Sequence, residues 1–172
     1  MLKTFALLFI VYIVYAKAQG MVALLKGIEN NHTLHMVYRQ TAFVCKPYGI
    51  ETLSELVMHT DLNSSCSAYL DSFRQTYPKE KFFAQMNLKV QQKYSVEGKD
   101  NRCVLYLSND YSYSEALLEK GYAKMPFEVK GKNPEMEYRF KKALKRAKTK
   151  KLGIWSDVNV RNCFLGESSI GK

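Results

Sequence analysis

The number and spacing of its cysteines restrict the chemistry of this chain, which has Cys45, Cys66, Cys103 and Cys163. No two of them form the C-x-x-C pair that is common in zinc sites, so we do not expect a zinc knuckle. An even number of dispersed cysteines is typical of disulfides in an oxidising compartment, and we expect two bridges. Three connectivities are possible at this point.

The N-terminal segment has the pattern of an export signal. Lys3 precedes an apolar run from Phe5 to Tyr15, and Ala16-Lys17-Ala18 is an A-x-A cleavage pattern. The run of about 11 residues is shorter than the roughly 20 that cross a bilayer. We therefore expect a signal peptide at residues 1–18, a mature chain without a transmembrane span, and a location in the bacterial periplasm or outside the cell. An uncleaved membrane anchor is the alternative.

The chain is strongly basic, with a formal net charge of +10 at pH 7. Loss of residues 1–18 removes Lys3 and Lys17 and no acid, which leaves +8. This excess favours a polyanionic partner, such as nucleic acid or teichoic or lipid phosphates, or an acidic partner protein. Solubility alone is the other explanation.

Short strands would form the frame that positions any site. Apolar and alternating patterns predict a three-stranded meander over residues 21–28, 33–38 and 41–45, with a polar turn at 29–32. A hairpin is predicted from strands at 89–94 and 102–107, with its turn at 97–100.

Three helices are predicted around these strands. One begins near Asn63 or Ser64 and ends before Pro78, and one spans 112–120. The last opens at Pro134 and reaches residue 152. Residues 50–63 fit a short amphipathic turn or a covered loop. The order of elements indicates an α+β fold, a five-stranded Greek-key barrel of the OB type with three helices.

The last predicted helix is rich in basic residues outside its apolar stripe. This pattern is typical of a solvated face, and contact with nucleic acid is the functional alternative. The basic residues are Lys141, Lys142, Lys145, Arg146, Lys148, Lys150 and Lys151.

Two segments in the second half carry a specific pattern. Residues 114–124 read S-E-A-L-L-E-K-G-Y-A-K, and residues 140–156 end in K-L-G-I-W-S. With D-N-R at 100–102, they resemble the staphylococcal nuclease (thermonuclease, SNase-like) family. The likeness covers 21–156, through motifs in the second half and strand order in the first. It implies an SNase-like OB-fold domain at 19–156 and a C-terminal tail at 157–172 that a disulfide tethers.

The resemblance implies phosphodiester cleavage with calcium, a glutamate and two arginines. Arg102 matches one arginine, whereas Val44 stands at the position of the other. Gly49 replaces an aspartate that binds the metal, and Thr52 replaces the glutamate. A shift of one residue would bring Glu51 to the glutamate position. Arg102 could instead be a solvated or ion-paired surface group.

The calcium site is incomplete in this comparison. The metal-binding aspartate of the family's first turn falls on Asn31 or His32, neither of which supplies a carboxylate. Glu29 remains as an acid near the start of that turn. We therefore expect no cofactor and no metal ligands. The alternative is a Ca²⁺ site rebuilt in a rearranged loop, from Glu29, Glu51, Glu55 and Asp61.

The resemblance also implies binding residues and a disulfide pairing. The region where the family stacks a nucleotide base lies near several aromatic residues of this chain: Tyr106, Tyr111, Tyr113, Tyr122 and Phe127. Tyr113, Phe127 and Lys124 are the binding candidates, and core or rim packing is the alternative for each ring. The family's strands around Val44 and Arg102 run close together. That proximity implies Cys45–Cys103, and Cys66–Cys163 then ties the tail to the first helix.

We interpret the chain as an exported, catalytically degenerate relative of these nucleases that binds nucleic acid or an envelope partner. The first alternative is an active secreted or periplasmic calcium-dependent phosphodiesterase that cleaves DNA or RNA. The second is a purely structural protein that stabilises another envelope component.

Overall fold

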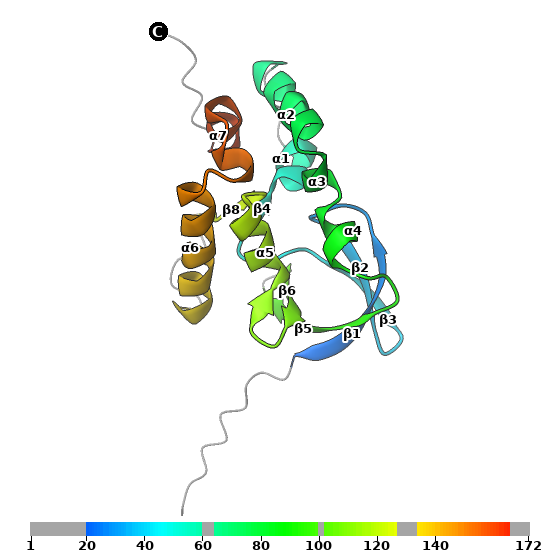
Figure 1. Ribbon diagram of the computed structural model, residues 1–172. Coiled ribbons are helices and arrows are strands. Elements are labelled where there is room, and N and C mark those ends of the chain that lie inside the picture. Colours follow the sequence, from blue (N-terminus) through cyan, green and yellow to red (C-terminus); the bar gives the residue numbers. More distant parts are fainter. Residues whose placement is uncertain (1–19, 60–63, 100–101, 127–133, 166–172) are drawn as a thin grey trace, which may run out of the picture.

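A six-stranded antiparallel sheet forms the centre of the computed structural model, which describes residues 20–59, 64–99, 102–126 and 134–165 (Figure 1). The strand order is β3-β2-β1-β5-β6-β7, and a separate pair joins β4 to β8. The strands are β1 (Met21–Ile28), β2 (Leu34–Tyr38), β3 (Thr41–Cys45), β4 (Glu51–Thr52), β5 (Lys93–Lys99), β6 (Arg102–Ser108), β7 (Tyr111–Ser112) and β8 (Ala123–Lys124).

The sheet curls until the segment after β3 meets β6. Pro47 and Cys103 form a parallel bridge, in which the Tyr48 amide donates to the Cys103 carbonyl at 2.9 Å. The Cys103 amide donates to the Lys46 carbonyl at 2.8 Å, and a Cys45–Cys103 disulfide lies beside the bridge. Within the described residues this short contact takes the place of a continuous ladder. The α+β class is confirmed, and the arrangement of strands is compatible with an OB-like fold. The main sheet has six strands where five were expected, and the described part of the chain has more helices than the three predicted.

Helices cover one side and one end of the sheet (Figure 1). The three predicted helices correspond to α2, α5 and α6, and α1 forms in the segment whose structure the sequence left open. Figure 1 shows α5 between α6 and the sheet, and α7 beside α2. The helices are α1 (Leu53–His59), α2 (Ser64–Thr76), α3 (Pro78–Lys81), α4 (Phe83–Asn87), α5 (Tyr113–Lys120), α6 (Pro134–Thr149), the 3-10 turn η2 (Gly153–Trp155) and α7 (Val158–Leu165).

The strand predicted at 89–94 was wrong in its bounds. β5 starts at Lys93 and runs through Glu97 and Gly98, where a turn was expected. β5 pairs with β6 as far as Lys99 opposite Arg102. A different turn precedes β5 at Gln91, which has a positive φ of 67° and donates its amide to the Leu25 carbonyl at 2.7 Å. No glycine or proline marks this turn in the sequence, so the alternating residues before it resembled a strand.

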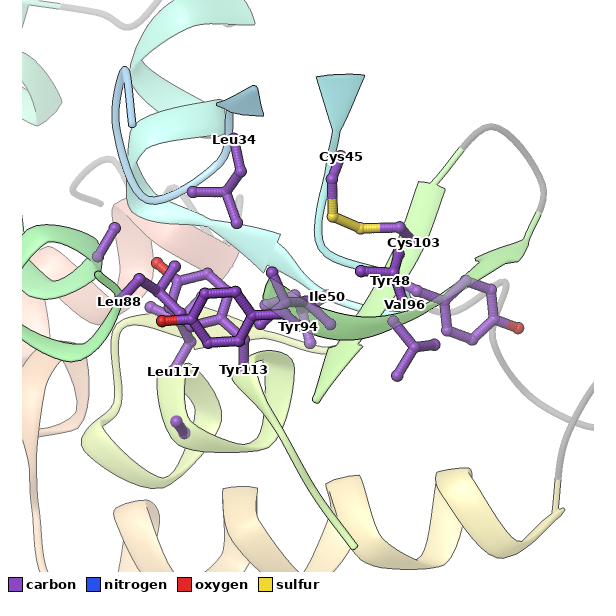
Figure 2. Close-up of a cluster of buried hydrophobic side chains, with 14 of the residues drawn as sticks. Leu34, Cys45, Tyr48, Ile50, Leu88, Tyr94, Val96, Cys103, Tyr113 and Leu117 are labelled. Carbon is purple, nitrogen blue, oxygen red and sulfur yellow. A yellow bond between two sulfur atoms is a disulfide. The ribbon is translucent and has the colours of Figure 1, made fainter. Parts of the chain in front are cut away.

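Two hydrophobic clusters hold the domain together. The larger lies between the sheet and α5, and Figure 2 shows Tyr113 and Leu117 pointing from α5 into it. The smaller lies among α2, α6, η2 and α7, where Phe73, Trp155 and Phe164 are buried. Its helices are also joined by the Cys66–Cys163 disulfide. Both disulfides thus agree with the pairing that the family resemblance implied.

None of the described helices is long and apolar enough to cross a membrane.

The end of α5 is fixed against the segment that follows α6. Gly121 ends α5 with a φ of 72°, a conformation that residues with a Cβ adopt at a cost. Its carbonyl accepts the Ile154 amide at 2.9 Å. A Cβ on Gly121 would lie 2.2 Å from the carbonyl oxygen of Leu152. This close approach joins the two segments that carry the family pattern.

Replacing Gly121 with alanine should therefore destabilise the protein. We expect Gly121→Ala to lower the free energy of unfolding by more than about 2 kcal/mol, from backbone strain and the clash with Leu152. Urea denaturation measures this change. Gly98→Ala is the matched control, because a Cβ there meets nothing within 4 Å, and its effect should be within about 0.5 kcal/mol. Equal stability of the two variants would contradict the prediction.

Candidate functional site

Arg102, the clean match to a catalytic arginine, is held inside a network of acceptors. Its Nη1 donates to the carbonyls of Pro47 and Ile50 at 3.1 and 3.2 Å, and its Nη2 donates to Glu55 Oε1 at 2.6 Å. Nη1 also lies 3.4 Å from Glu55 Oε2, so the guanidinium faces the carboxylate in the two-pronged manner typical of arginine. The side chain of Arg102 is 30% exposed.

Glu55 reaches this position because a helix starts directly after β4. Thr52 Oγ1 accepts the Glu55 amide at 3.1 Å, which is the N-terminal capping interaction of α1. Glu55 then lies in the first turn of α1, where the helix dipole favours a negative charge. The pairing of Glu51 with Lys124 across β4 and β8 holds the start of this segment in place.

His32 completes the network from the β1–β2 turn. Asn30 Oδ1 accepts the amides of His32 and Thr33 at 2.7 and 3.0 Å, which tightens the turn. The imidazole is 1% exposed, and its Nδ1 lies 3.2 Å from Glu55 Oε2. Glu55 therefore stands between a histidine and an arginine, and we call His32, Glu55 and Arg102 the central triad.

The carboxyl group of Glu55 is ionised at neutral pH. Burial by itself would raise its pKa, but hydrogen bonds and electrostatic attraction from His32 and Arg102 outweigh burial and lower the pKa to about 2. The negative charge of Glu55 thus neutralises much of the positive charge of Arg102. A phosphate would have to displace Glu55 to reach both terminal nitrogens of this guanidinium.

Asn31 and His32 face different parts of the molecule, although both match the position of the family's metal-binding aspartate. The Asn31 side chain donates to the carbonyl and the carboxylate of Glu80 and accepts the Ala84 amide at 2.8 Å. It therefore attaches the first turn to α3 and α4. Glu80 is fully buried, and burial raises its pKa against the opposing effects of Arg74 and Asn31. Of the two residues, His32 is the one that contacts Glu55 and so belongs to the central triad.

The other predicted acids have partners elsewhere. Glu51 pairs with Lys124 at 3.1 Å, and Glu29 pairs with His35 at 3.4 Å on the exposed edge of the β1–β2 hairpin. Asp61 lies outside the described residues. Where the structure describes the chain, it has no group of three or more His, Cys, Asp or Glu side chains that could hold a metal ion.

The two predicted binding residues that the structure describes, Tyr113 and Lys124, are engaged within the fold. Tyr113 is 1% exposed and packs in the core against Phe83, so no face of its ring is open to a base. Lys124 donates to the Phe164 carbonyl at 2.8 Å and thereby holds α7. Phe127 lies outside the described residues. Val44, at the position of the second arginine, is 46% exposed on β3.

One signal in the sequence could have placed Glu55 in advance. Residues 52–55 read T-L-S-E, the S/T-x-x-E pattern of a helix start. That pattern puts Glu55 in a first helical turn shortly after the third strand, near the strand that carries Arg102. The approach of His32 had no such signal, because it depends on how the β1–β2 turn folds.

The comparison with protein families agrees with this architecture. Residues 68–157 match the family model described as staphylococcal nuclease homologue, which is about half of the chain. The chain belongs to the staphylococcal nuclease homologue family. No curated protein matches it. The match to the SNase family includes Arg102 and both helices that carry the motifs, whereas His32 and Glu55 lie before its first residue.

The triad should give the protein a pH-dependent stability in acid. Because the pKa of Glu55 falls from 4.5 to about 2 on folding, its stabilising effect is present above pH 4.5 and is lost as the pH falls toward 2. Glu55→Gln should lower the free energy of unfolding by about 2 kcal/mol at pH 7, since partial exposure screens the charges. Denaturation from pH 7 to pH 2 should show this difference shrinking.

Glu29→Gln provides the control, because Glu29 and His35 are both about half exposed. Its effect should stay within about 0.5 kcal/mol at every pH. A difference between wild type and Glu55→Gln that stays constant down to pH 2 would show that the Glu55 charge does not stabilise the fold.

Proposed function

We propose that the protein is an exported, non-catalytic member of the staphylococcal nuclease homologue family that binds nucleic acid. The observation that carries this proposal is the ion pair between Arg102 and Glu55, at 2.6 Å. It engages the catalytic-type guanidinium with an internal acid and two backbone carbonyls, so that Arg102 serves to hold the fold rather than to contact a substrate phosphate.

Phosphodiester cleavage needs more positive charge than this site offers. The transition state gathers negative charge on the phosphate, which fixed guanidinium groups and a metal ion stabilise best. Val44 gives no charge at the position of the second arginine, and the triad has one carboxylate, already paired with Arg102. These features favour binding without cleavage.

The charge and the disulfides support the remaining parts of the proposal. The net charge of +8 without residues 1–18 favours a polyanion, and α6 carries four exposed lysines, Lys141, Lys142, Lys145 and Lys148. Two disulfides suit an oxidising compartment outside the cytoplasm. An envelope protein would be the partner if binding proves independent of salt.

An active phosphodiesterase is the second candidate function. The observation that favours it is the contact of 3.2 Å between His32 and Glu55, because a histidine oriented by a carboxylate is a common general base. In that reading, substrate or Ca²⁺ would draw Glu55 away from Arg102 and release the guanidinium for phosphate.

A cleavage assay separates the two functions. The disulfide-bonded mature protein is incubated with DNA and RNA, in calcium or in chelator, beside Arg102→Ala. We expect no cleavage that calcium supports and chelator removes, and no difference between wild type and Arg102→Ala. Chelator-sensitive cleavage that Arg102→Ala or His32→Ala abolishes would establish the enzyme instead.

Binding is tested with the same protein on labelled nucleic acid at several salt concentrations. Because each phosphate contact releases counterions, affinity should fall steeply as salt rises. An absence of binding at low salt would refute a nucleic-acid function.

A further inference from the structure

The outward face of α6 combines an exposed aromatic ring with lysines. Tyr138, Lys142 and Lys145 are spaced i, i+4 and i+7, so they lie along one side of the helix. Phe140 and Ala147 are buried on the opposite side. Tyr138 is 66% exposed, the largest exposed fraction among the large hydrophobic residues that the structure describes. We call these three residues the α6 stripe.

The two arginines of α6 form ion pairs that attach the helix to α5. Arg139 binds Glu115, and Arg146 binds Glu119 at 3.1 Å, so both arginines attach α6 to α5. The flanking lysines are also engaged: Lys141 pairs with Glu137, and the Lys148 ammonium lies 4.6 Å from the centre of the Trp155 ring.

The stripe itself keeps its positive charge. Within the described part of the chain, neither Lys142 nor Lys145 forms an ion pair with an acidic side chain, and both are exposed. Figure 1 shows α5 between α6 and the sheet, so the stripe faces away from the sheet and its central triad. The result is an exposed surface with a ring at one end and two lysines without acidic partners among the described residues beyond it.

We propose that the α6 stripe is a binding site for single-stranded nucleic acid. An unpaired base stacks on the Tyr138 ring, and the phosphates that follow it contact Lys142 and Lys145. Lys145 follows Tyr138 by seven positions, a rise of about 10 Å along the helix, so the three side chains can contact neighbouring groups of one strand. The ring selects single strands, because bases in a duplex have no free face for stacking.

This proposal rests on the proposed nucleic-acid function and names its surface. An acidic protein would need the charges but not an unpaired base, so the contribution of the ring distinguishes the two partners. The aromatic residue also separates this surface from an ordinary solvated helix face, for which lysines alone suffice.

Fluorescence anisotropy with a labelled oligodeoxythymidine of 12 nucleotides tests the charges. The double variant Lys142→Gln/Lys145→Gln should reduce the slope of log affinity against log salt by about 1.4, because two phosphate contacts on a single strand are lost. Lys79→Gln/Lys89→Gln removes the same charge from exposed positions outside α6 and should leave the slope near that of wild type.

The ring is tested separately with two substitutions of Tyr138. Tyr138→Ala should weaken binding about tenfold without changing the salt slope, since a stacking contact is lost and no charge changes. Tyr138→Phe keeps a stacking ring and should bind as wild type does. Thermal unfolding should show all four variants folded, because every substituted side chain is exposed.

The outcomes separate this proposal from the function on which it rests. Failure of the wild-type protein to bind the oligonucleotide would refute both. Salt-dependent wild-type binding that all four variants retain unchanged would keep the nucleic-acid function and overturn the assignment to α6. Equal losses in the two lysine double variants would likewise overturn it, since they would show attraction by overall charge.

Discussion

The contact between the segment after β3 and the start of β6 is the constraint on which the rest of the site depends. Two backbone hydrogen bonds and the Cys45–Cys103 disulfide hold these segments together. Arg102 directly precedes Cys103, so the same contact places its guanidinium against the carbonyls of Pro47 and Ile50. The chain turns from there into α1, which brings Glu55 to the remaining donors. The contact that brings the segment after β3 to β6 therefore also provides the acceptors for Arg102.

The ion pair with Glu55 restricts which further groups the Arg102 guanidinium can contact. A partly buried arginine needs acceptors, because an uncompensated charge away from water is costly. In this protein Glu55 and two carbonyls satisfy that need, and His32 binds the other side of the carboxylate. The arrangement stabilises the native state and engages the guanidinium that the family resemblance assigns to phosphate. On α6, by contrast, two arginines attach the helix to α5, and the exposed lysines of the stripe have no acidic partner in the described structure.

Residue patterns predicted the parts of the fold that local physics determines. Gly121 at the end of α5 and Pro134 at the start of α6 are local signals, and these helices form as expected. β5 was misplaced because a turn at Gln91 depends on hydrogen bonds to Leu25, far away in the sequence. The triad could not be predicted for the same reason, because His32, Glu55 and Arg102 come from three separate segments. Tyr113 looked available for stacking, yet its ring fills the core.

The Cys45–Cys103 disulfide has a further consequence for the order in which the protein matures. While its thiols are reduced, the seam beside β6 relies on backbone hydrogen bonds, each of which contributes only about 1 kcal/mol net. We therefore expect the reduced chain to open more readily at this seam than the oxidised chain does. Formation of the disulfide would then hold the seam closed, so that the fold is complete only once these two thiols have been oxidised.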